Sequence, residues 1–66
     1  MYMALKLKAA RANAELTQLE AAKCLGISKG TLSNYENYIT KPDVEMGKKI
    51  ATLYGMEVDD IAWNKC

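Results

Sequence analysis

The sequence contains no histidine, no phenylalanine, one proline and only two cysteines among its 66 residues. The missing histidine removes the commonest general base, and two cysteines without histidine are too few for a zinc site. No nucleophile motif and no glycine-rich phosphate loop is present. Cys24 and Cys66 stand far apart, and we interpret them as reduced thiols of a cytoplasmic protein rather than as a disulfide framework. We therefore expect neither an enzyme nor a bound metal or cofactor.

Long apolar runs are also missing. None approaches the roughly 20 residues that cross a bilayer, and the first ten residues have neither the length nor the order of a signal peptide. We expect no membrane contact and a single domain over residues 1–66, near the lower size limit for unaided folding. The sequence leaves open whether the native chain continues beyond Cys66 into a second, oligomerising domain.

The net charge is small, but the charged residues are unevenly distributed along the chain. The net charge is only +1, yet residues 1–41 hold six basic and three acidic side chains (+3), and residues 42–66 hold three basic and five acidic ones (−2). A basic half joined to an acidic half is typical of a protein that touches DNA with one side. Ordinary scatter of charge is the alternative interpretation.

Apolar residues at helical spacing predict an all-α fold of five short helices. The expected helices cover about 3–13, 17–25, 29–37 and 43–54, with a last short one that includes Val58 and Ile61. In the first, the buried stripe is expected at Met3, Leu7, Ala10 and Ala14. The fourth is expected to be capped by Asp43, with inward residues at Val44, Gly47, Ile50, Ala51 and Tyr54. No strand alternation is seen.

The most informative segment is 17–37. Thr17 and Glu20 form an S/T-x-x-E capping box, which predicts a helix start. Gly26 suits a left-handed helix end, and Ser28 is expected to cap the helix that follows. Two helices joined by so short a turn make a helix-turn-helix. Leu32 and Tyr35 are expected to face inward from its second helix. The outer face of that helix is then polar, and the major groove of DNA can admit such a helix.

These residues resemble the Cro and phage-repressor (XRE-like) helix-turn-helix family over residues 5–62. The resemblance is carried by Arg11, Leu16-Thr17-Gln18, Ala21-Ala22, Leu25-Gly26-Ile27-Ser28, Thr31-Leu32-Ser33, Tyr35-Glu36-Asn37 and Pro42. It implies a lambda-repressor-like domain in which helices 2 and 3 form the helix-turn-helix. It also implies a DNA-binding transcriptional regulator, expected to be a repressor of phage, prophage or bacterial origin.

The resemblance assigns roles to individual residues. Base reading falls to Lys29, Gly30 and Asn34, with Ser28 and Ser33 as weaker candidates. A lysine can donate to guanine O6 and N7, and an asparagine can pair with adenine N6 and N7. Contacts to the phosphate backbone are expected from Thr17, through its amide at a helix N-terminus, and from Gln18, Thr31, Asn37, Thr40 and Lys41. Arg11 and Glu36 match a structural ion pair.

Two residues depart from the family pattern. Tyr38 stands where the family commonly has glycine, so either its backbone is left-handed and strained or the loop takes another path. The expected contacts of Thr40 and Lys41 depend on that loop. Gly30 has no side chain to read a base, so specificity would rest on Lys29, Asn34 and the shape of the DNA.

The expected partner is double-stranded DNA carrying an inverted repeat, bound by a homodimer through half-sites about one helical turn apart. The last helices are expected to form the dimer surface. Three alternatives remain open. The chain could be an antitoxin with a protein partner, the controller of a restriction–modification operon, or an interaction module that has lost DNA binding. A steep salt dependence of binding would separate a DNA binder from the last of these.

Overall fold

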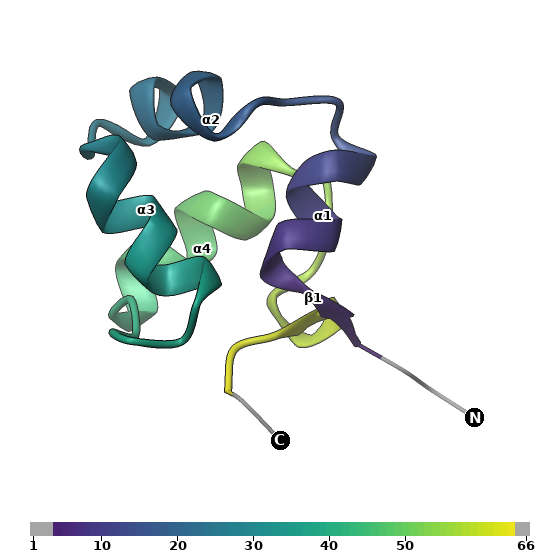
Figure 1. The fold of residues 1–66 in the computed structure, drawn as a ribbon. Helices are drawn as coiled ribbons and strands as arrows, with labels where there is room; N and C mark the ends of the chain where they lie inside the picture. Colours follow the sequence, from purple (N-terminus) through teal and green to yellow (C-terminus); the bar gives the residue numbers. More distant parts are fainter. Residues whose placement is uncertain (1–3, 65–66) are drawn as a thin grey trace.

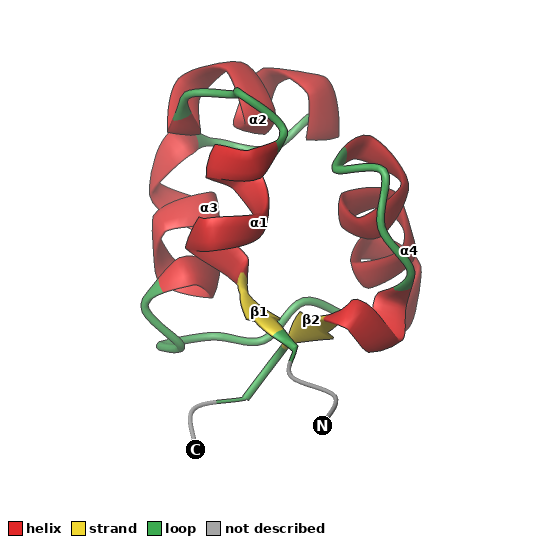
Figure 2. Ribbon diagram, turned by 90° about the vertical axis from the view of Figure 1, so that its right-hand side faces the viewer, coloured by secondary structure: helices red, strands yellow, loops and turns green. Residues whose placement is uncertain are grey.

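The computed structural model describes residues 4–64, which form four α-helices, one 3-10 turn and two short strands. In chain order these are β1 (Leu5–Lys6), α1 (Leu7–Asn13), α2 (Gln18–Leu25), α3 (Lys29–Glu36), α4 (Val44–Leu53), η1 (Val58–Asp60) and β2 (Ile61–Ala62). α2 crosses one end of α1 and α3, the strands lie at the other end, and α4 lies behind α1 and α3 (Figures 1 and 2). Among the described residues, no helix is both long and apolar enough to span a membrane.

One small core joins the helices. Its largest fully buried side chains are Leu7, Leu32 and Ile50, which come from α1, α3 and α4. Four of the buried core residues are alanines, which lets the short helices approach one another closely; these are Ala10, Ala21, Ala22 and Ala51. This composition explains how a chain with so few aromatic residues closes a core.

Side-chain caps begin three of the helices, as the sequence predicts. In the capping box the Thr17 hydroxyl accepts from the Glu20 N–H at 3.1 Å, and the Thr17 N–H donates to the Glu20 carboxylate at 2.9 Å. The donated N–H holds the pKa of Glu20 below its usual value. Ser28 caps α3 and Asp43 caps α4, each accepting from a backbone N–H three residues on. The predicted capping box and caps are confirmed.

A strand pair replaces two segments that were predicted to be helical. Leu5 and Lys6 pair in parallel with Ile61 and Ala62, so α1 begins at Leu7 and the expected fifth helix is reduced to η1 followed by β2. Helix propensity is a local signal, whereas this pairing joins distant parts of the chain and overrides it. The expected stripe residue Met3 lies outside the described residues.

Val44 is the one wrong member of the inward stripe predicted for α4. Its side chain is 77% exposed, whereas Gly47, Ile50, Ala51 and Tyr54 are buried as predicted. Side chains in the first turn of a helix point back toward its N-terminus. At the first position of α4 this direction leads away from the core, so the periodicity alone misplaced Val44.

Candidate nucleic-acid interface

The α2-turn-α3 unit has the geometry of a helix-turn-helix. Gly26 ends α2 in the left-handed conformation, with φ 72°, and Ala22 is 1% exposed between the helices. Ile27 packs against the core directly after the turn. Leu32, fully buried in the middle of α3, then fastens that helix from its inner side. The outer side of α3 is thereby presented to solvent as a fixed surface.

The residues predicted to read bases lie on this outer side. Lys29, Gly30 and Asn34 are exposed, and no hydrogen bond within residues 4–64 engages the side chain of Lys29 or Asn34. A Cβ added to Gly30 would meet nothing closer than the Ser28 hydroxyl at 3.9 Å. The first turn of α3 is therefore open, and two polar side chains on the outer side of the helix, those of Lys29 and Asn34, are unengaged.

The hydroxyls near the same edge are already in use. Ser28 Oγ accepts the Thr31 N–H at 3.1 Å and lies 2.8 Å from the Thr31 hydroxyl. Ser33 Oγ accepts from the Asn37 side-chain amide at 3.3 Å. Each hydroxyl hydrogen-bonds within α3 or its caps, which orients these groups and limits what they can offer a base.

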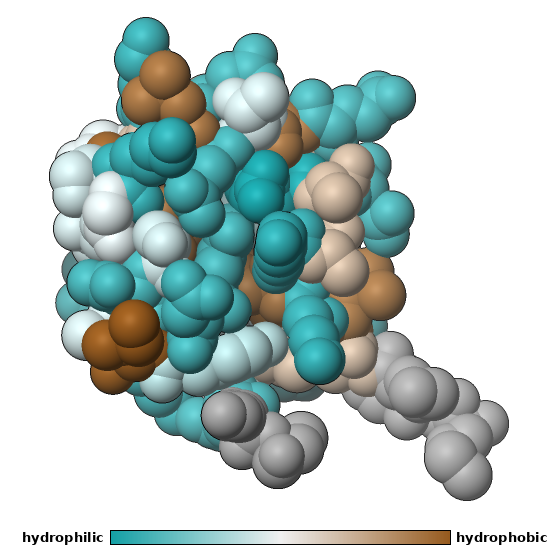
Figure 3. Space-filling model, in the orientation of Figure 1, coloured by the Kyte–Doolittle hydropathy of each residue, from teal (hydrophilic) through white to brown (hydrophobic). Residues whose placement is uncertain are grey.

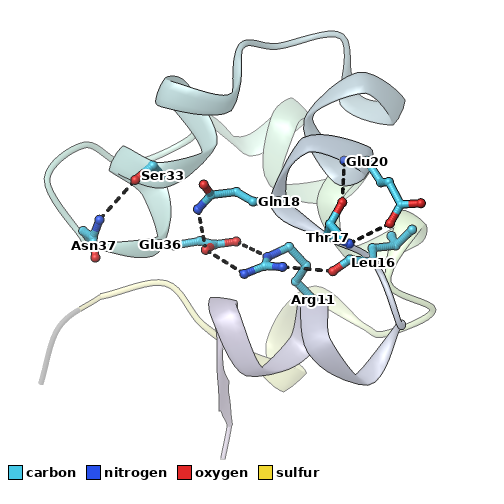
Figure 4. A network of polar contacts seen from close by, with 8 residues as sticks. All are labelled: Arg11, Leu16, Thr17, Gln18, Glu20, Ser33, Glu36 and Asn37. Atoms are coloured by element: carbon cyan, nitrogen blue, oxygen red, sulfur yellow. Dashed lines mark hydrogen bonds and ion pairs between the residues drawn. The ribbon is translucent and has the colours of Figure 1, made fainter.

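A buried polar network connects the first three helices (Figure 4). Arg11 Nε donates to Glu36 Oε2 at 2.7 Å, its Nη2 reaches Glu36 Oε1 at 3.4 Å, and its Nη1 donates to the Leu16 carbonyl at 2.9 Å. The side chains of Arg11 and Glu36 are 13% and 3% exposed. The pair thus lies inside the fold and joins α1 to the end of α3, as its predicted structural role requires.

Gln18 completes this network from the start of α2. Its amide nitrogen donates to Glu36 Oε1 at 3.0 Å, so it supports α3 from behind. A glutamine amide has two hydrogens, and this contact uses one. The second hydrogen remains for a phosphate, so the phosphate contact predicted for Gln18 is compatible with its position.

The amide of Thr17 does not lie free at the start of α2. It was expected to meet a phosphate, but it donates to the Glu20 carboxylate inside the capping box. The Thr17 hydroxyl accepts from Glu20 and keeps its own hydrogen to donate. Any phosphate contact by Thr17 must therefore come from this hydroxyl.

Tyr38 adopts the left-handed backbone, which decides between the two loop paths. Its φ is 60°, a conformation that favours glycine, and its hydroxyl donates to the Ala62 carbonyl in β2 at 3.2 Å. The loop then folds back, because the N–H groups of Ile39 and Thr40 both point to the Asn34 carbonyl. This turn holds the exposed residues Thr40 and Lys41 beside the end of α3.

The link from Tyr38 to Ala62 is a feature that sequence reasoning missed. The available signal was a bulky aromatic residue in a position where glycine is usual. Asn37 is the C-cap of α3 and its side chain is exposed, so the phosphate contact expected of it stays a prediction.

Tyr54 brings an unusual group close to this network. The residue is 7% exposed, and its hydroxyl has no hydrogen-bond partner within residues 4–64. Burial, with a smaller contribution from the Glu36 carboxylate, raises the pKa of Tyr54 to about 12, although Arg11 opposes the rise. The folded protein therefore favours the neutral phenol.

We expect Tyr54→Phe to leave stability at pH 7 unchanged or to raise it by up to about 1 kcal/mol, because it removes a buried hydroxyl without a partner. The tyrosine pKa is higher in the folded than in the unfolded chain. The stability that comes from this pKa difference is therefore fully present below pH 10 and is lost as the pH rises toward about 12. We expect wild type to lose about 1–2 kcal/mol of stability in this way, a figure reduced to allow for solvent screening. Tyr54→Phe should not lose it.

Urea unfolding of both proteins at pH 7, 10 and 11.5 measures this difference. The stability gap should widen in favour of the variant as the pH rises. Parallel stability curves, or a variant more than 1 kcal/mol weaker at pH 7, would contradict the assignment.

Comparison with known proteins places these residues in context. A family model described as helix-turn-helix matches residues 7–61. The chain is 41% identical over 59 residues to the HTH-type transcriptional regulator ImmR of Bacillus subtilis, covering 89% of this chain but 46% of that protein. It is 39% identical over 56 residues to an uncharacterized HTH-type transcriptional regulator of Methanocaldococcus jannaschii, covering 85% of each. No solved structure matches the chain significantly.

Proposed function

Because this chain belongs to the Cro/C1-type (XRE-like) helix-turn-helix family of DNA-binding regulators, we propose that it represses transcription by placing α3 in the major groove of an operator. The observation that carries the proposal is the outer side of α3. Lys29 and Asn34 extend from it unengaged, while Leu32 anchors the helix from within. A major groove admits one α-helix presented in this way.

In this proposal, sequence is read by two side chains. Lys29 donates to guanine O6 and N7, and Asn34 pairs with adenine N6 and N7. Gly30 lets the backbone of α3 approach the bases closely, since no side chain stands between them. Ser28 and Ser33 contribute less, because both hydroxyls already bond within the protein.

The phosphate backbone is held at the two ends of the unit. Gln18 and the Thr17 hydroxyl bind at the start of α2, with Thr31 near the start of α3. Asn37, Thr40 and Lys41 bind on the other side, where the Tyr38 turn places the loop. Contacts of this kind fix orientation and carry no sequence information.

Two copies bind an inverted repeat in this proposal, because one module of this size buries too little surface for useful affinity. The proposed dimer surface lies on the first turns of α4, on η1 and around Trp63, away from the outer side of α3. Val44 and Val58 are exposed there beside a hollow of about 310 Å³ that Trp63 also lines. Apolar surface of this kind is suited to a second copy.

Selection from a random duplex library at several salt concentrations tests the proposal. We expect an inverted repeat to be enriched, with affinity falling steeply as salt rises. Lys29→Ala and Asn34→Ala should each weaken binding about 5- to 150-fold and relax the preference at one position, corresponding to about 1–3 kcal/mol. Lack of enrichment together with salt-independent binding would refute the proposal.

A further inference from the structure

A hollow of about 480 Å³ lies beside the C-terminal end of α3, next to the contacts assigned above. Its walls come from parts of the chain that are distant in sequence, namely β1, the first turn of α1, the end of α3 and the segment after β2. The polar groups that line it are those of Lys6, Lys8, Glu36, Asn37, Tyr38 and Asn64. The groups that line this hollow decide what it can bind.

The hollow carries an excess of positive charge. Lys6 and Lys8 are both exposed, and within residues 4–64 neither has an ion-pair partner. The one carboxylate in the wall belongs to Glu36, and Arg11 and Gln18 already bond to its oxygens. Two uncompensated cations therefore face the hollow.

The other lining groups add hydrogen-bond donors. The Asn37 amide uses one hydrogen on Ser33 and keeps a second. Asn64 also lines the hollow and is exposed. The Tyr38 hydroxyl, by contrast, spends its hydrogen on the Ala62 carbonyl. Cations with nearby amide N–H groups are suited to an anion with several oxygens, such as a phosphate.

The strand pair fixes where this charge lies. Lys6 pairs with Ala62, and its neighbour Leu5 packs against the core, so the alternation of the strand turns Lys6 outward. Figures 1 and 2 show β1 and the start of α1 on the same side of the molecule as α3, with α4 behind. In Figure 3 this side is mainly hydrophilic. A helix over residues 3–13 would not have brought Lys6 to this place.

We propose that the hollow binds a phosphate of the DNA backbone beside the half-site that α3 reads, with Lys6 and Lys8 as its charged ligands. The inference rests on the proposed function and adds a contact to it. The competing explanation is structural, because the last turn of α3 has no basic residue and the lysines would offset the negative end of its dipole. A structural role would change stability and leave DNA binding alone.

The test measures the affinity of Lys6→Ala/Lys8→Ala for the selected duplex and for random DNA as a function of salt concentration. The slope of log K against log salt should fall by about 2, because each phosphate charge neutralised contributes roughly 0.9 to it and the two copies bring two such hollows. Binding should weaken equally on both DNAs, because phosphate contacts carry no sequence information. Lys6→Arg/Lys8→Arg should retain the wild-type slope.

Lys23→Ala is the control, since it removes a positive charge from an exposed position on α2 to which no DNA or dimer contact is assigned, and it should retain the wild-type slope. Equal salt slopes for Lys6→Ala/Lys8→Ala and Lys23→Ala, with wild type binding normally, would overturn the phosphate site alone. A lower unfolding midpoint for Lys6→Ala/Lys8→Ala with an unchanged slope would also overturn it, in favour of the dipole role. Failure of the wild-type protein to bind DNA at all would overturn the proposed function and this inference together.

Discussion

Arg11→Ala is expected to lower the free energy of unfolding by about 3–5 kcal/mol, a large fraction of the total. The substitution removes the only ion-pair partner that the described residues give to Glu36, whose side chain is 3% exposed. Breaking a buried pair from one side costs about 3–5 kcal/mol, because an uncompensated charge stays behind. A chain of this length has a total stability of about 3–10 kcal/mol. Urea unfolding, followed by circular dichroism, measures the change.

Two variants separate the buried charge from the packing of the arginine side chain. Arg11→Met/Glu36→Leu removes both charges and should recover most of the stability, as apolar replacement of buried pairs does in other proteins. Lys23→Ala removes an exposed charge from α2 and should stay within about 0.5 kcal/mol of wild type. An Arg11→Ala variant within 1 kcal/mol of wild type would contradict this account of the network.

Local signals predicted much of the fold correctly. The capping box at Thr17, the left-handed Gly26 and the caps at Ser28 and Asp43 depend on a few neighbouring residues. Such short-range hydrogen bonding is readable from spacing alone. It defines the helix-turn-helix and therefore which side of α3 faces outward.

Contacts between distant residues could not be predicted in this way. The pairing of Lys6 with Ala62 and the bond from the Tyr38 hydroxyl to the Ala62 carbonyl both depend on where the C-terminal segment returns. No periodicity near residue 6 or 38 records that return. The Thr17 amide shows a different limit. The capping box was predicted correctly. It also occupies the Thr17 N–H, however, which was expected to contact a phosphate.

Gly30→Glu should have opposite effects on folding and on DNA binding. Gly30 is exposed in the first turn of α3, and a new side chain there meets open space. Glutamate is a better helix former than glycine and is favoured near a helix N-terminus, so stability should rise by up to about 1 kcal/mol. In the major groove, however, the same carboxylate would face the bases and the phosphate charge.

Placing like charges together in an interface costs several kcal/mol. A cost of about 3 kcal/mol corresponds to at least about a 100-fold loss of affinity. Thr52→Glu is the matched control, since it adds the same charge at an exposed position on α4, behind α3. It should change affinity only through net charge.

The central claim is that the outer side of α3 contacts DNA. The most direct test is a paired measurement on Gly30→Glu and Thr52→Glu, which gives the unfolding free energy of each and its affinity for the selected duplex. We predict that Gly30→Glu is as stable as wild type or more so and binds at least about 100-fold more weakly, while Thr52→Glu stays close to wild type. Equal affinities for the two variants would contradict the placement of α3 in the major groove.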